Sequence, residues 1–146
     1  MCFSFFLSHM TQITAQYDTN NFRSGTNTKE YIMLHHTATG EGTLQGIINA
    51  FTTGNQVSAH YIIDTNGDII QIGNDDMILW HAGTGTWNGI TDMNRHSIGI
   101  EVIGPLPGFT DAQREACSQL IQDLALKHDI PAENVIRHQD LSLIHI

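Results

Sequence analysis

The chain has 146 residues, the size of one ordinary domain, and a chain of this length buries about 68–70% of its unfolded surface on folding. Its 6 Lys and Arg residues are outnumbered by 15 Asp and Glu residues, which gives a formal net charge of −9. That charge opposes binding to phosphate backbones and anionic surfaces, so nucleic acid is not an expected partner. The two cysteines, Cys2 and Cys117, provide neither a disulfide framework nor a Cys-x-x-Cys zinc pair.

The N-terminal segment does not read as a targeting signal. Its first nine residues are apolar but lack the basic start and the cleavage site of a signal peptide. The sequence also contains no run near the roughly 20 apolar residues that a membrane span needs. Met10 is a candidate start of the domain, and the polar stretch 11–29 is expected to be irregular. We therefore predict an extension and lead-in over 1–29 and one domain over 30–146.

Hydrophobic periodicity and turn residues then predict alternating strands and helices. An Asn-Gly turn between two apolar runs indicates a hairpin, and Thr110 with Gln113 forms a capping box at the start of a helix. The fold class expected is α/β, a single domain with a central mixed sheet flanked by helices. In chain order we expect a strand at 30–35, a helix from 44 to 51, hairpin strands at 59–64 and 68–72, a loop region over 74–94, a strand at 97–103, a helix through 112–124 and a strand at 135–137.

Two histidine clusters about a hundred residues apart follow short apolar runs. His35 and His36 end the first predicted strand, and His138 follows the last. Functional sites in α/β folds lie at such strand ends, and a catalytic zinc takes three protein ligands of this kind plus water. His36 must face away from His35 because Cβ directions alternate along a strand. From spacing alone, His35 and His138 are either metal ligands or ordinary hydrogen-bonded histidines.

An acidic residue stands inside an otherwise apolar strand. Glu101 follows Ile98-Gly99-Ile100, where an ionised carboxylate is costly unless it meets a cation, hydrogen bonds or a metal-bound water. Burial would raise its pKa toward the working range of a general base. The alternative is a carboxylate at the strand edge that faces solvent or pairs with Arg95.

The ordered set of motifs resembles the zinc-dependent N-acetylmuramoyl-L-alanine amidases, a family that includes phage endolysins and peptidoglycan recognition proteins. The resemblance covers roughly Tyr31 to Ser142. It rests on His35-His36-Thr37, Ser58-Ala59-His60-Tyr61, Trp80-His81-Ala82-Gly83, Asn94, Ser97-Ile98-Gly99-Ile100-Glu101 and His138-Gln139-Asp140-Leu141-Ser142.

The resemblance implies roles for individual residues. It makes His35 and His138 zinc ligands and Glu101 the general base. It places Trp80 and His81 in a loop that lines the substrate groove, and it assigns Asn94 to the support of that loop. His60 either contacts substrate as well or lies in the core. Ala59 stands where one branch of the family has a catalytic tyrosine, so the glutamate-type arrangement is the one implied.

The end of the chain departs from the family. Pro-Gly, a Lys or Arg, and an Asp or Cys that is the third zinc ligand usually follow the Asp-Leu-Ser segment, but this chain reads Leu143-Ile144-His145-Ile146. Three explanations stay open: a truncated C-terminus, His145 as a substitute ligand, or a protein that has lost catalysis. The first is the favoured expectation.

The resemblance thus implies an enzyme that cleaves the amide between N-acetylmuramic acid and L-alanine in peptidoglycan, with Zn²⁺ as cofactor. The alternative is a noncatalytic peptidoglycan-binding module that has lost a metal ligand. The expected partner is the muropeptide substrate, without a membrane span, and the expected state is a monomer. The protein would be made in the cytoplasm and act on the cell wall, through host lysis or non-classical secretion.

Overall fold

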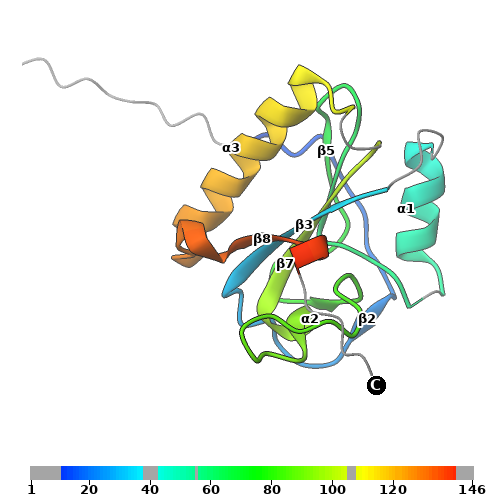
Figure 1. Cartoon of the computed structure of the whole chain (residues 1–146). Coiled ribbons are helices and arrows are strands. Elements are labelled where there is room, and N and C mark those ends of the chain that lie inside the picture. The colour runs from blue at the N-terminus through cyan, green and yellow to red at the C-terminus, as the bar shows by residue number, and fades with distance from the viewer. Residues whose placement is uncertain (1–10, 38–42, 55, 105–107, 141–146) are drawn as a thin grey trace, which may run out of the picture.

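The fold centres on a six-stranded mixed sheet flanked by helices (Figure 1). The computed structural model describes residues 11–37, 43–54, 56–104 and 108–140. In spatial order the sheet contains β1 (Ala15–Gln16), β5 (Ile69–Gln71), β4 (Tyr61–Ile63), β7 (Ser97–Val102), β3 (Tyr31–His36) and β8 (Val135–Arg137). The remaining elements are α1 (Leu44–Thr52), α2 (Met93–His96), α3 (Asp111–His128), a small sheet of β2 (Phe22–Arg23) and β6 (Ile78–Leu79), and short 3-10 turns at Ala132–Asn134 and His138–Asp140.

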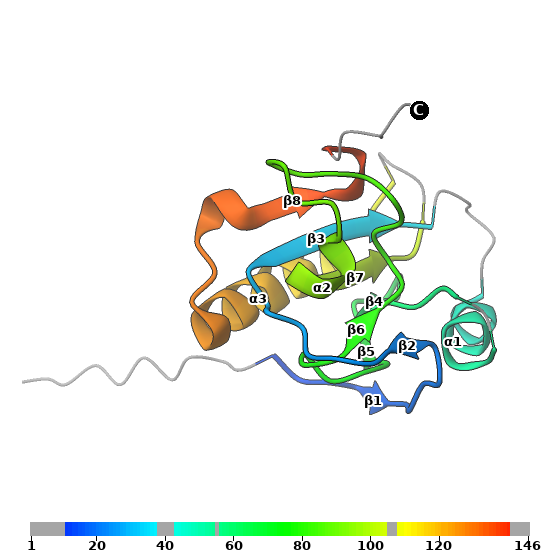
Figure 2. The same ribbon diagram turned by 90° about the horizontal axis from the view of Figure 1, so that it is seen from below.

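The central strands β4, β7, β3 and β8 run parallel, whereas β4 and β5 form the antiparallel hairpin predicted from the Asn-Gly turn. Figure 2 shows these strands side by side, with β8 toward one end of the sheet and β1 at the other. Figure 1 shows α3 and α1 on opposite sides of the sheet. The α/β class with a mixed sheet and flanking helices is therefore confirmed. Within the described ranges, no helix is both long and apolar enough to cross a bilayer.

Both faces of the sheet are buried, and strand β4 shows how the sequence achieves this. Tyr61 and Ile63 belong to the apolar cluster under α3, while Ile62 between them belongs to the cluster under α1. Successive side chains on a strand point to opposite faces, so an unbroken apolar run serves both layers. All three side chains are at most 4% exposed.

Helix α3 begins where its capping box predicts. The Thr110 hydroxyl accepts from the Gln113 backbone N–H, and the Gln113 side-chain oxygen accepts from the Thr110 N–H at 3.0 Å. The amide nitrogen of Gln113 also donates to the Ile103 carbonyl at 2.7 Å. One buried side chain thus caps the helix and ties it to the end of β7.

The polar segment before Tyr31 differs from the irregular lead-in that we expected. Its β1 strand pairs in parallel with β5, and Thr14 and Tyr17 donate backbone hydrogen bonds to Ile69 and Gln71, each at 2.8 Å. A two-residue edge strand has too few positions to display an alternating pattern, and the main-chain hydrogen bonds that hold it are independent of side-chain type. Residues 11–29 therefore contribute to the folded unit.

A buried carboxylate links the hairpin region to the end of α3. Asp75 is 6% exposed and accepts hydrogen bonds from the Tyr61 hydroxyl at 2.6 Å and from Nε2 of His128 at 2.7 Å. Lys127 adds a weaker contact at 3.4 Å. Burial acts to raise the pKa of Asp75, but these hydrogen bonds more than offset it and hold the pKa below 3.8. The ionised form is therefore the one that the fold prefers.

We expect Asp75→Asn to lower the free energy of unfolding at pH 7 by about 1–3 kcal/mol, because it weakens hydrogen bonds made to a buried charge. A lowered folded-state pKa contributes stability above the unfolded value, and that contribution disappears as the pH falls through the folded value. The difference in free energy of unfolding between wild type and variant, measured in urea, should therefore shrink as the pH falls below the ordinary pKa of an aspartate. Asp76→Asn is the matched control, because that neighbouring side chain is 72% exposed. Equal losses in both variants would contradict the assignment.

Candidate active site

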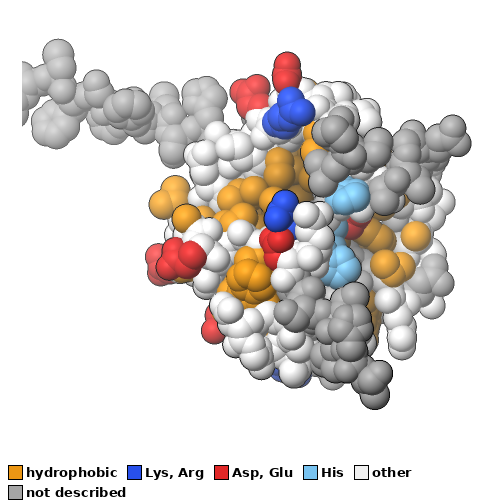
Figure 3. Space-filling view, viewed as in Figure 1, with side chains coloured by type: hydrophobic (Ala, Val, Ile, Leu, Met, Phe, Trp, Pro, Cys, Tyr) orange, Lys and Arg blue, Asp and Glu red, His pale blue; other side chains and the backbone are white. Residues whose placement is uncertain are grey.

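The site lies where β3, β7 and β8 end. Parallel pairing places His35 of β3 directly opposite Glu101 of β7, and His138 follows the last residue of β8. The carboxyl ends of parallel strands share one edge of a sheet, which is why residues so distant in sequence meet there. Figure 3 shows histidine side chains gathered on this face of the molecule, beside a hydrophobic surface. The structure thus brings together the three residues given catalytic or ligand roles.

The histidines form a connected cluster. Nε2 of His35 lies 3.0 Å from Nδ1 of His81, and the two rings meet edge to face with centroids 5.1 Å apart. The His35 ring also lies 4.8 Å from that of His138, centroid to centroid. The loop predicted to line the groove therefore sends His81 into direct contact with the first candidate ligand.

Burial keeps the inner members of this cluster uncharged. Desolvation, reinforced by neighbouring His138 and His36, lowers the pKa of His35 to about 3. The same cause, with His35 and His60 nearby, holds the pKa of His81 well below its usual value. Neutral imidazoles are the form in which histidine binds metals and exchanges hydrogen bonds in both directions.

A glycine makes room for His81. A Cβ built on Gly99 would lie 2.6 Å from Cγ of His81 and 2.7 Å from its Nδ1, closer than nonbonded atoms approach. The imidazole therefore rests directly on the backbone of β7. This accounts for a glycine between Ile98 and Ile100, a position where glycine by itself weakens the strand.

We expect Gly99→Ala to displace the His81 ring, lower the free energy of unfolding by about 1–3 kcal/mol and reduce turnover. Most of that loss should vanish when the same change is made in a His81→Ala background, since the clash is then removed. A double-mutant cycle measured by urea unfolding tests this. Additive losses would show that the glycine serves some other purpose.

Glu101 is partly buried and has a raised pKa. Desolvation raises the pKa of its carboxyl group to about 7. Among the described residues none forms a salt bridge with Glu101, and Arg95, the partner considered for it, lies 3.6 Å from Asp92 instead. A carboxyl group that is half ionised near neutral pH can accept a proton in one step and return it in the next.

His60 does not lie where a substrate contact requires. It is 0% exposed, its Nδ1 accepts from the Gly99 N–H at 3.0 Å, and its Nε2 lies 2.9 Å from the Met77 carbonyl. Burial lowers its pKa to about 4. The structure thus corrects its expected substrate contact in favour of the core alternative: His60 supports the strand on which His81 rests.

Trp80 precedes His81 and remains partly exposed. The guanidinium carbon of Arg23 lies 5.4 Å from the centroid of its ring, a cation–π contact, and Arg23 also pairs with Asp92 at 2.5 Å. These contacts hold the partly exposed indole against β2, so Trp80 does not line the groove as the resemblance implied. The sequence did not predict Arg23 of β2 as a partner, because residues 11–29 were expected to be irregular.

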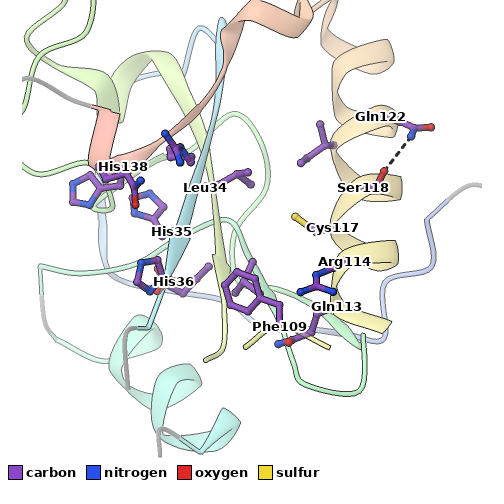
Figure 4. Close-up of a pocket in the computed structure, with 15 residues that line it drawn as sticks. Leu34, His35, His36, Phe109, Gln113, Arg114, Cys117, Ser118, Gln122 and His138 are labelled. Atoms are coloured by element: carbon purple, nitrogen blue, oxygen red, sulfur yellow. Dashed lines mark hydrogen bonds between the residues drawn. The ribbon is translucent and has the colours of Figure 1, made fainter. Parts of the chain in front are cut away.

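A groove of about 870 Å³ runs from the site toward α3 (Figure 4). His36 lines it on the α3 side of β3, with its ring 6.5 Å from that of Phe109, which agrees with the prediction that it faces away from His35. Cys117 of α3 also lines the groove, and burial raises its thiol pKa to about 11. The remaining lining residues are Leu34, His35, Glu101, Val102, Gln113, Arg114, Ser118, Ile121, Gln122, Arg137, His138 and Gln139.

The donor set fits zinc only in part. His35 and His138 offer two imidazoles close together, a ligand type that zinc accepts. The described residues contain no group of three histidine, cysteine or acidic side chains arranged to hold one metal ion. The substitute ligand considered from the sequence, His145, lies outside the residues that the structure describes. The described part of the chain therefore brings two candidate ligands together.

Comparison with known proteins identifies the family of the chain. A sequence model of the family described as N-acetylmuramoyl-L-alanine amidase matches residues 25–144. N-acetylmuramoyl-L-alanine amidase AmiD of Escherichia coli is 33% identical over 110 residues, which cover 64% of this chain and 40% of AmiD. This chain thus spans less than half of that relative.

Solved structures share the fold. A selenomethionine AmpD crystal structure superposes with a TM-score of 0.81 at 23% identity, covering 94% of this chain and 88% of that one. AmpDh3 of Pseudomonas aeruginosa, solved with an anhydromuramic pentapeptide, gives a TM-score of 0.71 at 25% identity, covering 87% of this chain and 58% of that one. With the family match spanning most of the sequence, the chain belongs to the N-acetylmuramoyl-L-alanine amidase family.

Proposed function

We propose that this protein hydrolyses the amide bond between N-acetylmuramic acid and L-alanine in peptidoglycan. The observation that carries the proposal is the placement of Glu101, a carboxyl group with a pKa of about 7, directly opposite His35, where both residues line the groove. Family membership supports the same reaction, as does the muropeptide bound to the structurally similar AmpDh3.

We propose further that the reaction uses zinc held by His35 and His138, with a third ligand outside the described residues. When bound, zinc would polarise the scissile carbonyl and supply hydroxide at neutral pH, because it lowers the pKa of water to about 7. The chain's own contribution is to hold the imidazoles of His35 and His138 close together, with His81 in contact with His35.

Glu101 would act as the general base. Its carboxylate takes a proton from the attacking water and then delivers it to the leaving amine nitrogen of L-alanine, so one group serves both halves of the reaction. A raised pKa suits this double role, because neither protonation state is strongly favoured near neutral pH. The partial burial of the carboxylate keeps its charge from being screened by bulk water.

Substrate contacts would extend beyond the groove. Trp80 does not line the groove, but it precedes His81 in the chain and presents a partly exposed indole on which a sugar ring could stack. His81 is largely committed to His35 and the backbone of β7, so we assign it to support rather than to substrate contact. The negative net charge opposes an anionic wall at long range, so affinity must come from the groove itself.

A noncatalytic peptidoglycan-binding module is the second candidate. The observation that favours it is the lack of a three-ligand metal group among the described residues. The partly buried Glu101 argues against it, since a binding module gains nothing from a desolvated carboxyl group without a described ionic partner.

The deciding experiment measures new L-alanine amino termini released from purified peptidoglycan by the chain with added zinc. Release that stops when zinc is chelated is the expected result. Binding to the wall without release would instead favour the binding module.

We also propose that the protein works as a monomer and lyses cell walls after synthesis in the cytoplasm. Light scattering should then give a mass near 16.2 kDa, and a loss of turbidity in wall suspensions would report lysis.

A further inference from the structure

A buried amide anchors the turn that carries His81. Asn94, 6% exposed on α2, accepts two backbone hydrogen bonds at its side-chain oxygen, from His81 N–H at 3.0 Å and from Ala82 N–H at 2.7 Å. These bonds hold the His81–Ala82 peptide in place, and with it the entry of the His81 ring and the backbone that carries the Ala82 carbonyl. Through this turn, one side chain in α2 reaches both candidate ligands.

The first consequence concerns His138. Its Nε2 lies 3.1 Å from the Ala82 carbonyl oxygen, which can only accept a hydrogen bond. Nε2 must therefore carry the proton. In an uncharged imidazole the lone pair then lies on Nδ1, so this nitrogen is the one left free to bind a ligand.

The second consequence reaches His35 through His81. Nε2 of His81 lies 3.4 Å from both the carbonyl and the hydroxyl oxygen of Ser97, and that hydroxyl already donates to the Met93 carbonyl at 2.5 Å. Both partners are therefore acceptors, which places the His81 proton on Nε2 and leaves Nδ1 to accept. Its neighbour at 3.0 Å, Nε2 of His35, must then be the donor.

We propose that Asn94 is a positioning residue which, through the His81–Ala82 turn, locks His35 and His138 into the same tautomer. Both then have Nε2 protonated and Nδ1 free. The inference rests on the proposed role of these two histidines as ligands. Partners of the second ring nitrogen are known to orient metal-binding histidines and tune their affinity, and here one amide would set both at once.

His60 supplies an internal reference within the same chain. It has the same tautomer, since its Nδ1 accepts from Gly99 N–H and its Nε2 donates to the Met77 carbonyl. Neither bond passes through Asn94 or the turn that it holds. The His60 and His81 rings are neighbours, with centroids 5.7 Å apart, but neither hydrogen-bond partner of His60 belongs to that turn. A change at Asn94 should therefore leave the His60 tautomer unchanged while altering those of His35 and His138.

The test is histidine-selective ¹⁵N NMR on the metal-free chain at pH 8, where two-bond proton–nitrogen correlations identify which ring nitrogen is protonated. We expect unprotonated Nδ1 in both His35 and His138. A proton on Nδ1 of either would overturn the inference. This measurement needs no turnover, so an inactive chain with both tautomers as expected would count against the proposed function alone.

Two variants then test the role of Asn94. Asn94→Ala removes the acceptor, and we expect mixed tautomers at His35 and His138, an unchanged His60, and zinc binding weakened about 10–100-fold in a competition titration. Asn94→Asp keeps an oxygen for both N–H groups and should restore a single tautomer. Unchanged His35 and His138 signals in Asn94→Ala would refute the positioning role. The His60 signal reports whether the variant is folded, and the wild-type spectrum remains decisive if it is not.

Discussion

Replacing Glu101 with glutamine is expected to reduce turnover of peptidoglycan by about 10²–10⁴-fold, the usual contribution of a positioned general base. Glutamine has nearly the same shape but cannot accept the water proton, so binding to peptidoglycan should persist. Release of L-alanine amino termini measures the first effect and co-sedimentation with purified walls the second. Turnover at the wild-type rate would rule out the proposed mechanism.

The same substitution should stabilise the fold. Desolvation raises the pKa of Glu101 to about 7, so its ionised form opposes folding. That cost is absent below the unfolded value near 4.5 and grows as the pH rises to about 7. At pH 8 and without metal, the free energy of unfolding of the Glu101→Gln variant should exceed that of wild type by roughly 1–3 kcal/mol. Glu115→Gln, on the exposed side of α3, is the control and should change neither quantity.

The second large effect is expected from His35→Ala, which should remove both zinc binding and activity. A site that keeps only one of the two described imidazoles would hold zinc weakly, and the change also leaves Nδ1 of His81 without its partner. Zinc competition and L-alanine release should both fall to background. Excess zinc should not restore the rate, because the hydrogen bond to His81 is lost as well.

His96→Ala is the matched control for that variant. His96 lies at the end of α2, where its Nδ1 pairs with Glu30 at 2.6 Å, outside the cluster around His35. Its loss should change the free energy of unfolding by no more than about 1 kcal/mol and leave zinc affinity intact. If both variants lost zinc equally, the metal would be bound somewhere other than the ends of β3 and β8.

Local patterns in the sequence predicted much of the fold. The capping box at Thr110 set the start of α3, and the Asn-Gly turn set the β4–β5 hairpin. Such signals act between neighbours in the chain, so they can be recognised without knowing the tertiary structure. The short β1 strand was not predicted, because backbone hydrogen bonds to β5 hold it and its own sequence shows no strand pattern.

In the candidate site, too, local patterns predicted some features, and contacts between distant segments decided the others. The sequence alone showed that Glu101 is an acid within an apolar strand and that His35 and His138 end strands, since each is a property of a short segment. Only the tertiary structure decided the role of His60. The motif around His60 suggested a place near the site, but the parallel packing of β4 against β7 buries it in the core. It also decided how His81 contacts His35 and how Asn94 holds that turn, because hydrogen bonds between distant segments depend on how those segments pack, which no pattern within a single segment specifies.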